Sequence, residues 1–494
     1  MTKKNDNTYT SNSLNRFTRR HFMHTTLGGA FILGLSSCDQ VEDSVETYMG
    51  PEINELEFVT FNRQYHDISI DAATQFPHNA IRGGANSGIT DPVAIAYRLQ
   101  QLIDIADATT AEALIDNLLV AQENSITFID YKGFIPNLEF ANTNAGFLKS
   151  EAEFSIPDNA ILSARVAMAA SAFSGTPIAD KAMLFLANQK EGYNFYLSGT
   201  SLAFPETGSA LNSDIGEPKV EYLFSGYYTE LAFVLSYFIG DSATIQDPQV
   251  GMDAWNALIS APGIPTAQHG DSFTALTTLT VPLAKNGSAY QYFQSLLALP
   301  TASISQSMSD ALYNVLFSFL DAARFENLPG IYSGAPNAQG NFLSDNGLSR
   351  LTVPANATTS RESIATVDAL AAALRLFPAE SLERQAIRRW IGVFDATPGI
   401  KGASGLFGGV DKSGNVSESY YARQNAAMIL FDSTAPSHLE SFLIANSKTS
   451  LADMFSRIAF SQDGLPVQRV PGDLPLPPPL AQIFPTTPED DTTG

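Results

Sequence analysis

The chain has 494 residues, a formal net charge of −23 and 44% hydrophobic residues. This length and hydrophobic content allow at least one large core, while the acidic balance excludes nucleic acid as a partner, because phosphate binding needs clustered basic side chains. With a single cysteine, Cys38, the chain has no internal disulfide.

The N-terminus has the order of an export signal. The pair Arg19-Arg20 precedes an apolar stretch, residues 27–34, that is too short to span a bilayer. Paired arginines before such a stretch resemble the twin-arginine signal of the bacterial machinery that exports folded proteins. Leu35-Ser36-Ser37-Cys38 resembles a lipoprotein cleavage site. We therefore expect a signal peptide at 1–37, a lipid on Cys38 that attaches the protein to a membrane, and a location in the cell envelope, periplasmic or on the outer surface.

The segments that flank the central part of the chain differ from it in composition. Residues 38–58 are rich in acidic side chains and poor in large apolar ones, which predicts a tether. Residues 463–494 contain too many prolines for a helix or a central strand, which predicts an extended tail. The part between them, 59–462, is expected to fold as a single large domain.

Within that domain, apolar residues recur at helical spacing in one segment after another. Asp91-Pro92 predicts a capped helix start, and so do Thr109 to Glu112, Ser155 to Asp158 and Thr176-Pro177. We expect helices at about 91–106, 109–120, 155–173, 176–189, 227–239, 251–260, 287–298, 305–324, 361–377, 379–393, 418–431, 436–446 and 449–459.

The expected helices are of two kinds. Residues 231–239 are apolar on every side, whereas 379–390 carry charged residues on one side only. The first kind is typical of a helix that is buried all round, the second of one with a solvent face. Such an alternation of inner and outer helices predicts a mostly α fold, an (α/α)6-type toroid of about a dozen helices.

The histidines give no sign of a metal site. After the signal peptide only four remain, His66, His78, His269 and His438, and they are widely scattered. The fingerprints of nucleotide-binding loops and serine hydrolases are absent from the sequence. Asp411 to Asn415 lacks the glycine and glutamate of a calcium loop and predicts a turn. We therefore expect neither a metal nor a cofactor.

Two acidic residues at helix starts are candidates for acid catalysis. Glu230 falls in the first turn of the apolar helix, and Tyr227, Phe233 and Tyr237 share its face. Aromatic walls of this kind raise the pKa of a carboxyl group toward that of a general acid. The alternative for Glu230 is that an acid in a first turn simply complements the helix dipole. Asp158 also has two interpretations, as a catalytic group or as part of a helix cap.

Further polar and aromatic residues are candidates for substrate binding. They are the loop acids Glu153 and Glu206, the tyrosines Tyr222, Tyr227 and Tyr228 near Glu230, and Tyr420, Tyr421 and Arg423 at a late helix start. The alternatives to substrate binding are simple exposure to solvent at the surface for the acids and a structural ion pair for the arginine.

Three segments resemble the glycoamylase-like bacterial domain. They are Glu153 to Leu162, Ala203 to Gly208 and Gly226 to Leu231, and the similarity extends over about 80–460. This family includes β-1,2-glucan hydrolases and folds as an (α/α)6 barrel. The resemblance implies a glycoside hydrolase that acts on a glucan or another oligosaccharide, with Glu230 and Asp158 as catalytic groups.

The chain also departs from the family pattern. Arg423-Gln424-Asn425 stands where the family has Asp-Gln-Gly after its late tyrosine, and only two tryptophans, Trp255 and Trp390, are present. A fold can persist where an activity does not. The alternatives are therefore a lipoprotein of the cell envelope that binds glycans without catalysis and one that is purely structural.

Overall fold

The computed structural model describes residues 51–129, 131–140, 154–197, 203–204, 207–208, 219–220, 223–239, 249–260, 266–270, 278–337, 342–354, 362–462, 465–466 and 474–484. Residues 49–494 form one compact unit.

Six helical segments form a closed inner ring in this part of the chain. They are α5 (Pro92–Asp104), α7 (Ile156–Ala172), α9 (Tyr228–Tyr237), α11 (Ala289–Phe293) with η4 (Gln294–Leu297), α13 (Asp368–Ala373) with η8 (Leu374–Leu376), and α15 (Ala422–Leu430). Each segment contacts the next in this order, and α15 contacts α5, which closes the ring.

Outer helices pack against this ring. They are α6 (Ala108–Ile129) beside α5, α8 (Pro177–Leu197) beside α7, α10 (Gln249–Ser260) beside α9, α12 (Gln306–Phe325) beside α11, α14 (Leu382–Asp395) beside α13, and α3 (Glu55–Asn62) beside α15. The prediction of a mostly α, (α/α)6-type toroid is therefore confirmed.

The burial of individual helices follows their sequence pattern, as expected. Residues 228–236 of α9 are all buried. In α14 the buried residues include Ile387, Trp390 and Ile391, while Leu382 is exposed. Both tryptophans are enclosed, and their Nε1 groups donate to backbone oxygens of Met454 and Pro475. They pack the core and present no face to a ligand.

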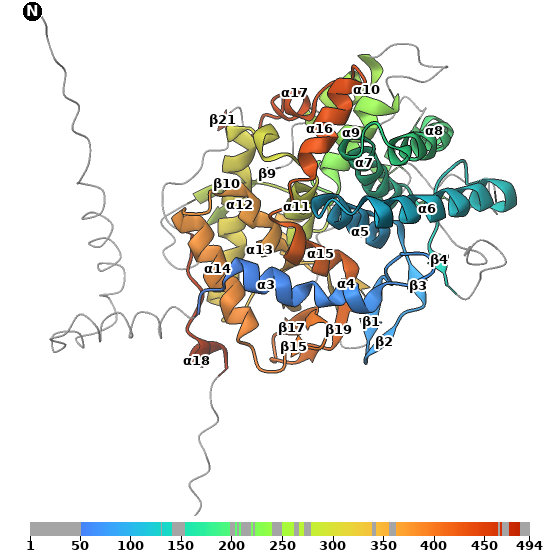
Figure 1. The fold of residues 1–494 in the computed structure, drawn as a ribbon. Helices are drawn as coiled ribbons and strands as arrows, with labels where there is room; N and C mark the ends of the chain where they lie inside the picture. The colour runs from blue at the N-terminus through green and yellow to red at the C-terminus, as the bar shows by residue number, and fades with distance from the viewer. Residues whose placement is uncertain are drawn as a thin grey trace, which may run out of the picture. The chain divides into compact units, whose positions relative to one another are not determined.

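Short strands β1, β2, β15, β17 and β19 lie together at one end of the ring, whereas β9, β10 and β21 lie on the side of α12 (Figure 1). The larger sheets join β11 (Ile331–Tyr332), β14 (Ile364–Thr366), β17 (Gly409–Asp411) and β18 (Val416–Ser417), and β19 (Ser419–Tyr421), β1 (Ala80–Arg82) and β2 (Ala85–Asn86). Antiparallel pairs join β3 (Ile89–Thr90) to β4 (Leu138–Glu139), β5 (Phe154–Ser155) to β7 (Thr207–Gly208), β6 (Ala203–Phe204) to β8 (Lys219–Val220), β9 (Thr266–Gly270) to β10 (Thr278–Pro282), β12 (Ala335–Pro336) to β13 (Phe342–Leu343), β15 (Lys401–Gly402) to β16 (Gly405–Leu406), and β20 (Ser461–Gln462) to β21 (Leu465–Pro466).

The opposite end of the ring is covered by α16 (Pro436–Ala445) and α17 (Leu451–Phe455), as Figure 1 shows. Phe442 of α16 packs on Phe233 and Tyr237, toward the C-terminal end of α9. Ser236 donates a hydrogen bond to the backbone oxygen of Thr449. Because this end is covered, the end where the inner helices begin is the place to look for a site.

The remaining short helices are α4 (Gln64–Ser69), η5 (Thr301–Ser303), η6 (Ser349–Leu351) and α18 (Leu480–Ile483).

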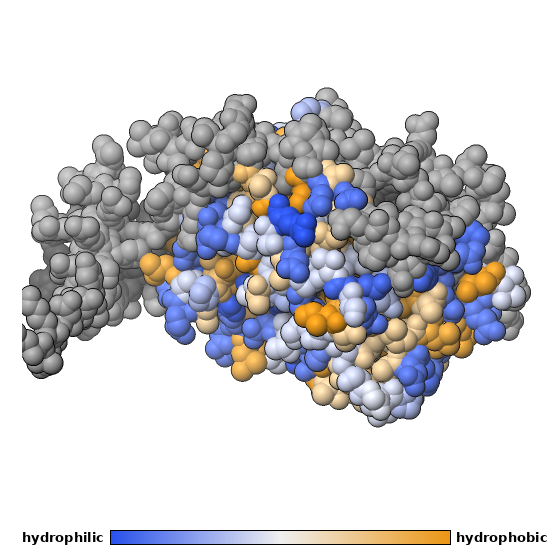
Figure 2. Space-filling view, turned by 90° about the horizontal axis from the view of Figure 1, so that it is seen from above, coloured by the Kyte–Doolittle hydropathy of each residue, from blue (hydrophilic) through white to orange (hydrophobic). Residues whose placement is uncertain are grey.

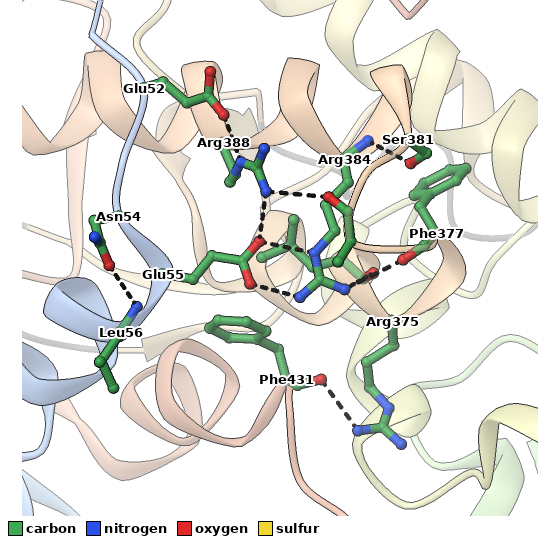
Figure 3. A network of polar contacts seen from close by, with 12 residues as sticks. Glu52, Asn54, Glu55, Leu56, Arg375, Phe377, Ser381, Arg384, Arg388 and Phe431 are labelled. Carbon is green, nitrogen blue, oxygen red and sulfur yellow. Dashed lines mark hydrogen bonds and ion pairs between the residues drawn. The ribbon is translucent and has the colours of Figure 1, made fainter.

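An arginine cluster fastens the N-terminal segment to the barrel (Figure 3). Arg384 of α14 holds Glu55 through two hydrogen bonds of 2.8 and 2.6 Å, and Arg388 holds Glu52 at 2.6 Å. Phe58 is buried. The predicted tether therefore ends earlier than residue 58, because its last acidic residues are packed into the outer ring as the start of α3.

Several expected helix boundaries were wrong, among them the end of the helix expected at 176–189, which runs to Leu197. The helix expected at 109–120 does begin there, at Ala108, but Asp107 rather than Thr109 accepts from its first turn, and the helix runs on to Ile129. The segments expected as helices from 361 and from 418 begin as strands, β14 and β19. Each strand is hydrogen-bonded to distant segments, and this pairing decides its conformation.

The turn at Asp411 is confirmed. The Asp411 carboxylate accepts from the backbone N–H groups of Ser413 and Asn415, both at 2.8 Å.

Hydrophilic and hydrophobic residues are interspersed on the face seen in Figure 2, as far as described residues are visible there. No helix in the described ranges is long and apolar enough to cross a membrane.

Candidate functional site

Polar side chains from the first turns of several inner helices meet at the end of the ring that carries the strands. Ser155 caps α7, and Asp158 follows in its first turn. Arg423 stands in the first turn of α15, and its Nη2 lies 3.1 Å from Asp158 Oδ1. The ion pair therefore joins the starts of two helices that lie on either side of α5.

The pair of Asp158 and Arg423 is partly open to solvent. Their side chains are 25% and 26% exposed. Burial raises the pKa of Asp158, and the nearby carboxylate of Asp91 adds to this, while Arg423 acts against it. The net result is a carboxyl group that holds its proton to a higher pH than an ordinary aspartate, which is the property that proton donation requires.

Two tyrosines stand beside this ion pair, and the sequence analysis did not single them out. Burial raises the pKa of both Tyr97 and Tyr290, and Arg423 and Asp158 act electrostatically on each. The Tyr290 ring lies between two glycines, since a Cβ at Gly226 or Gly334 would lie within 2.9 Å of it. The glycines are thus required for the ring to occupy this position.

Glu230 is enclosed, unlike Asp158. The residue is 2% exposed, and its carboxylate forms an ion pair with Arg165 and accepts from Ser295 Oγ at 3.1 Å. Arg165 in turn donates to Gln100 Oε1 at 3.1 Å and lies over the Tyr97 ring. In this arrangement a substrate has no access to the carboxylate of Glu230. The geometry favours a role in holding Arg165 and Tyr97.

The tyrosines expected to bind substrate are buried to different extents. Tyr228 is fully buried and donates to the backbone oxygen of Tyr292 at 2.7 Å, so it belongs to the core. Tyr227, before α9, is 7% exposed. Tyr420 is also largely buried, against Phe407, and its hydroxyl accepts from the backbone N–H of Ser404.

Tyr421 is the more open of the late pair. Its hydroxyl accepts from Arg82, and its ring lies 5.6 Å from that of Phe342. Tyr421 therefore stands at a rim made by β19, β1 and β13. Glu153, Glu206, Tyr222 and Cys38, also expected to be functional, lie outside the described residues.

Asp368 is a further acidic residue in the first turn of an inner helix, and sequence reasoning missed it. It accepts from Thr366 Oγ1, and from Ser333 Oγ at 3.4 Å. Burial raises the pKa of Asp368 to about 6, although these hydrogen bonds oppose the shift. The signal that could have found it is the shared pattern of a short apolar strand followed at once by an acid in a first turn, as at Asp158.

The fold has known counterparts among solved structures. No family model and no curated protein sequence matches the chain. It is similar to an endo-β-1,2-glucanase mutant from Talaromyces funiculosus in complex with β-1,2-glucan, with 13% identity, a TM-score of 0.65, and coverage of 90% of this chain and 98% of that one. It is also similar to the endo-β-1,2-glucanase from Chitinophaga pinensis in complex with sophorotriose and glucose, with 9% identity, a TM-score of 0.58, and coverage of 84% and 100%.

At these identities the similarity establishes the fold. The chain has the glycoamylase-like (α/α)6 barrel of these glucan hydrolases, as the three sequence segments implied. What the barrel does depends on the residues at its open end.

Proposed function

We propose that this protein is an exported, lipid-anchored glycoside hydrolase that binds a glucan where its inner helices begin. The observation that carries the proposal is the partly exposed pair of Asp158 and Arg423, placed beside Tyr97 and Tyr290. Related barrels with glucans bound support the choice of ligand.

Asp158 is the group to which we assign proton donation. A general acid must be protonated near the working pH and must reach the glycosidic oxygen. Asp158 meets both needs, since burial raises its pKa and a quarter of its side chain remains exposed, whereas Glu230 is enclosed. Glu230, enclosed with Arg165, acts in our proposal as a positioning residue.

Glycoside hydrolysis needs a second carboxylate. Glu153, which directly precedes β5, is our first candidate, and we add Glu206, expected from the sequence to bind substrate, because it precedes β7, which pairs with β5. A separation of about 5–5.5 Å from Asp158 would imply retention of configuration, and about 6.5–9.5 Å inversion.

Aromatic side chains suit the binding of sugars, because apolar sugar faces pack on rings. Tyr421 and Phe342 form such a pair at the rim, and Arg82 adds hydrogen-bond donors. We assign this pair to a sugar unit that lies farther from the cleaved bond.

The export and anchoring part of the proposal is supported by the sequence. Arg19-Arg20 and the apolar stretch after it direct export, and Cys38 carries the lipid. The acidic surface would be repelled by an anionic bilayer, so the lipid provides the attachment.

A second candidate function is glycan binding without catalysis. It is favoured by Arg423, which stands where the family that the sequence resembles has an aspartate. Arg423 also forms an ion pair with Asp158 at 3.1 Å. An arginine that stabilises the ionised form of Asp158 opposes proton donation.

A screen of oligosaccharides separates the two candidates. The purified protein is incubated with linear β-1,2-glucan, sophorotriose, and β-1,3- and α-1,4-linked glucans of similar length. Products are measured by chromatography, and binding is measured by the shift of the unfolding midpoint. We expect shorter products from one linkage class. A shift without products supports the binding protein, and the absence of both rejects binding and hydrolysis together.

A further inference from the structure

A second small site lies between α13 and α15. A pocket there has about 10 Å³ of space for a water-sized sphere. Its polar walls include Asp368, Gln424 and Asn425, each at most 3% exposed. These polar walls are buried, and the free space between them suits a single water or ion.

Two amide oxygens of these wall residues have no hydrogen-bond donor. They are Gln424 Oε1 and Asn425 Oδ1, both fully buried. The residues Tyr421, Gln424, Asn425 and Met428 lie three and four apart in sequence, so they share the face of α15 that lines the pocket. Buried acceptors of this kind are costly unless something binds them.

The orientation of both amides is determined by their nitrogen atoms. Gln424 Nε2 donates to the backbone oxygens of Gly334 and Gly408, at 3.2 and 2.8 Å. Asn425 Nδ2 donates to the backbone oxygen of Asn62 at 2.9 Å. Turning either amide would put its oxygen against a carbonyl oxygen, so the oxygens must face the other way.

The charge in the pocket is also uncompensated. In the described part of the chain, Asp368 receives hydrogen bonds from the hydroxyl groups of Thr366 and Ser333 and from the backbone N–H groups of Ala369 and of Asp368 itself, but no arginine or lysine forms an ion pair with it. The nearest basic groups of the neighbouring helices are engaged elsewhere: Arg423 binds Asp158, and Arg375 binds the backbone oxygens of Phe431 and Ser433.

We propose that Asp368, Gln424 and Asn425 bind one monovalent cation, Na⁺ or K⁺. One carboxylate and two neutral amide oxygens are the hard oxygen ligands that such ions prefer. The single negative charge matches a monovalent ion, whereas sites for Ca²⁺ collect more carboxylates.

The ion would connect the first turns of α13 and α15. Gln424 directly follows Arg423, so an ion held by Gln424 fixes the start of the helix that carries the ion pair with Asp158. The site shares Tyr421 with the proposed sugar-binding rim but takes no part in the proposed hydrolysis, and its test requires no activity.

Unfolding midpoints in different salts test the proposal. The full protein is titrated at pH 8 with NaCl and KCl, with choline chloride added to keep the ionic strength constant. We expect a saturable rise of about 2–4 °C with Na⁺ or K⁺ relative to choline. Asp368→Asn should remove the response. Asp411→Asn, in the surface turn, should keep it and serves as the matched control.

Two results would overturn the proposal. Equal midpoints in all three salts would mean that the pocket holds only a water. A full response in Asp368→Asn would place the ion elsewhere. If Asp368→Asn does not fold, Asn425→Ala takes its place, since the loss of one ligand oxygen should raise the half-saturating concentration about tenfold or more. An unchanged concentration would reject the site.

Discussion

Asp158 and Glu230 are both acids in first turns of inner helices, but their surroundings differ. Asp158 is a quarter exposed beside Arg423, whereas Glu230 is enclosed with Arg165. The same amide substitution should therefore have opposite consequences at the two positions.

Asp158→Asn should lower kcat about 100-fold or more, because the amide has no proton to transfer at the required pH. The midpoint of unfolding should change little, since the ion pair that is lost is partly exposed. Glucan binding, measured by the thermal shift, should persist. Unaltered turnover would remove Asp158 from the mechanism.

Glu230→Gln should instead destabilise the fold. Removing one partner of a buried ion pair leaves the Arg165 guanidinium uncompensated, at a cost of about 3–5 kcal/mol. Chemical denaturation measures this cost. A stable Glu230→Gln protein that binds glucan but has lost turnover would return the role of general acid to Glu230.

The Arg19-Arg20 pair and Cys38 lead to a prediction about export and lipidation. Replacing Arg19 and Arg20 by lysine should leave unprocessed precursor in the cytoplasm, and Cys38→Ala should abolish incorporation of labelled fatty acid. Arg16→Lys, just outside the pair, is the control. Normal processing of the double-lysine variant would contradict the twin-arginine signal.

At the scale of elements, α3 is the piece that completes the outer ring. It packs beside α15 although almost the whole barrel separates the two in sequence. Figure 3 shows Glu55 held between Arg384 and Arg388. Burial opposes the charge of Glu55, but the hydrogen bonds and charges of the arginines outweigh it and lower the pKa of Glu55.

Glu55→Gln should lower stability at pH 7 by about 1.5–3 kcal/mol, the usual contribution of charged hydrogen bonds. Because the folded-state pKa is lowered, this stabilisation is present above the ordinary glutamate pKa and is lost as the pH falls through the folded-state value. The difference between wild type and variant should thus vanish in acid. Glu57→Gln, on the exposed side of α3, is the matched control.

For the whole molecule, we predict that neither a divalent-metal chelator nor a reductant changes the unfolding midpoint, with Na⁺ and K⁺ held constant. The only cysteine is Cys38. In the described ranges, no group of three or more His, Cys, Asp or Glu residues is placed to hold a metal. A drop of several degrees with chelator alone would reveal a divalent site.

The sequence by itself determined the helical architecture and most helix starts. Helical periodicity and caps are local properties, and they placed α5, α7, α9 and α12 closely. The strands that precede α13 and α15 were missed because their partners are far away in the chain, which no local pattern records.

Only the tertiary structure decided which polar groups meet. Sequence named Asp158, Glu230 and Arg423, but their roles depend on burial and on partners 65 to 265 residues away. Closing the ring encloses Glu230 with Arg165, leaves Asp158 at the edge beside Arg423, and brings Asp368 to Gln424 and Asn425. The physical reason is that the pKa and the accessibility of a side chain are set by its surroundings in space, and distant segments supply those surroundings.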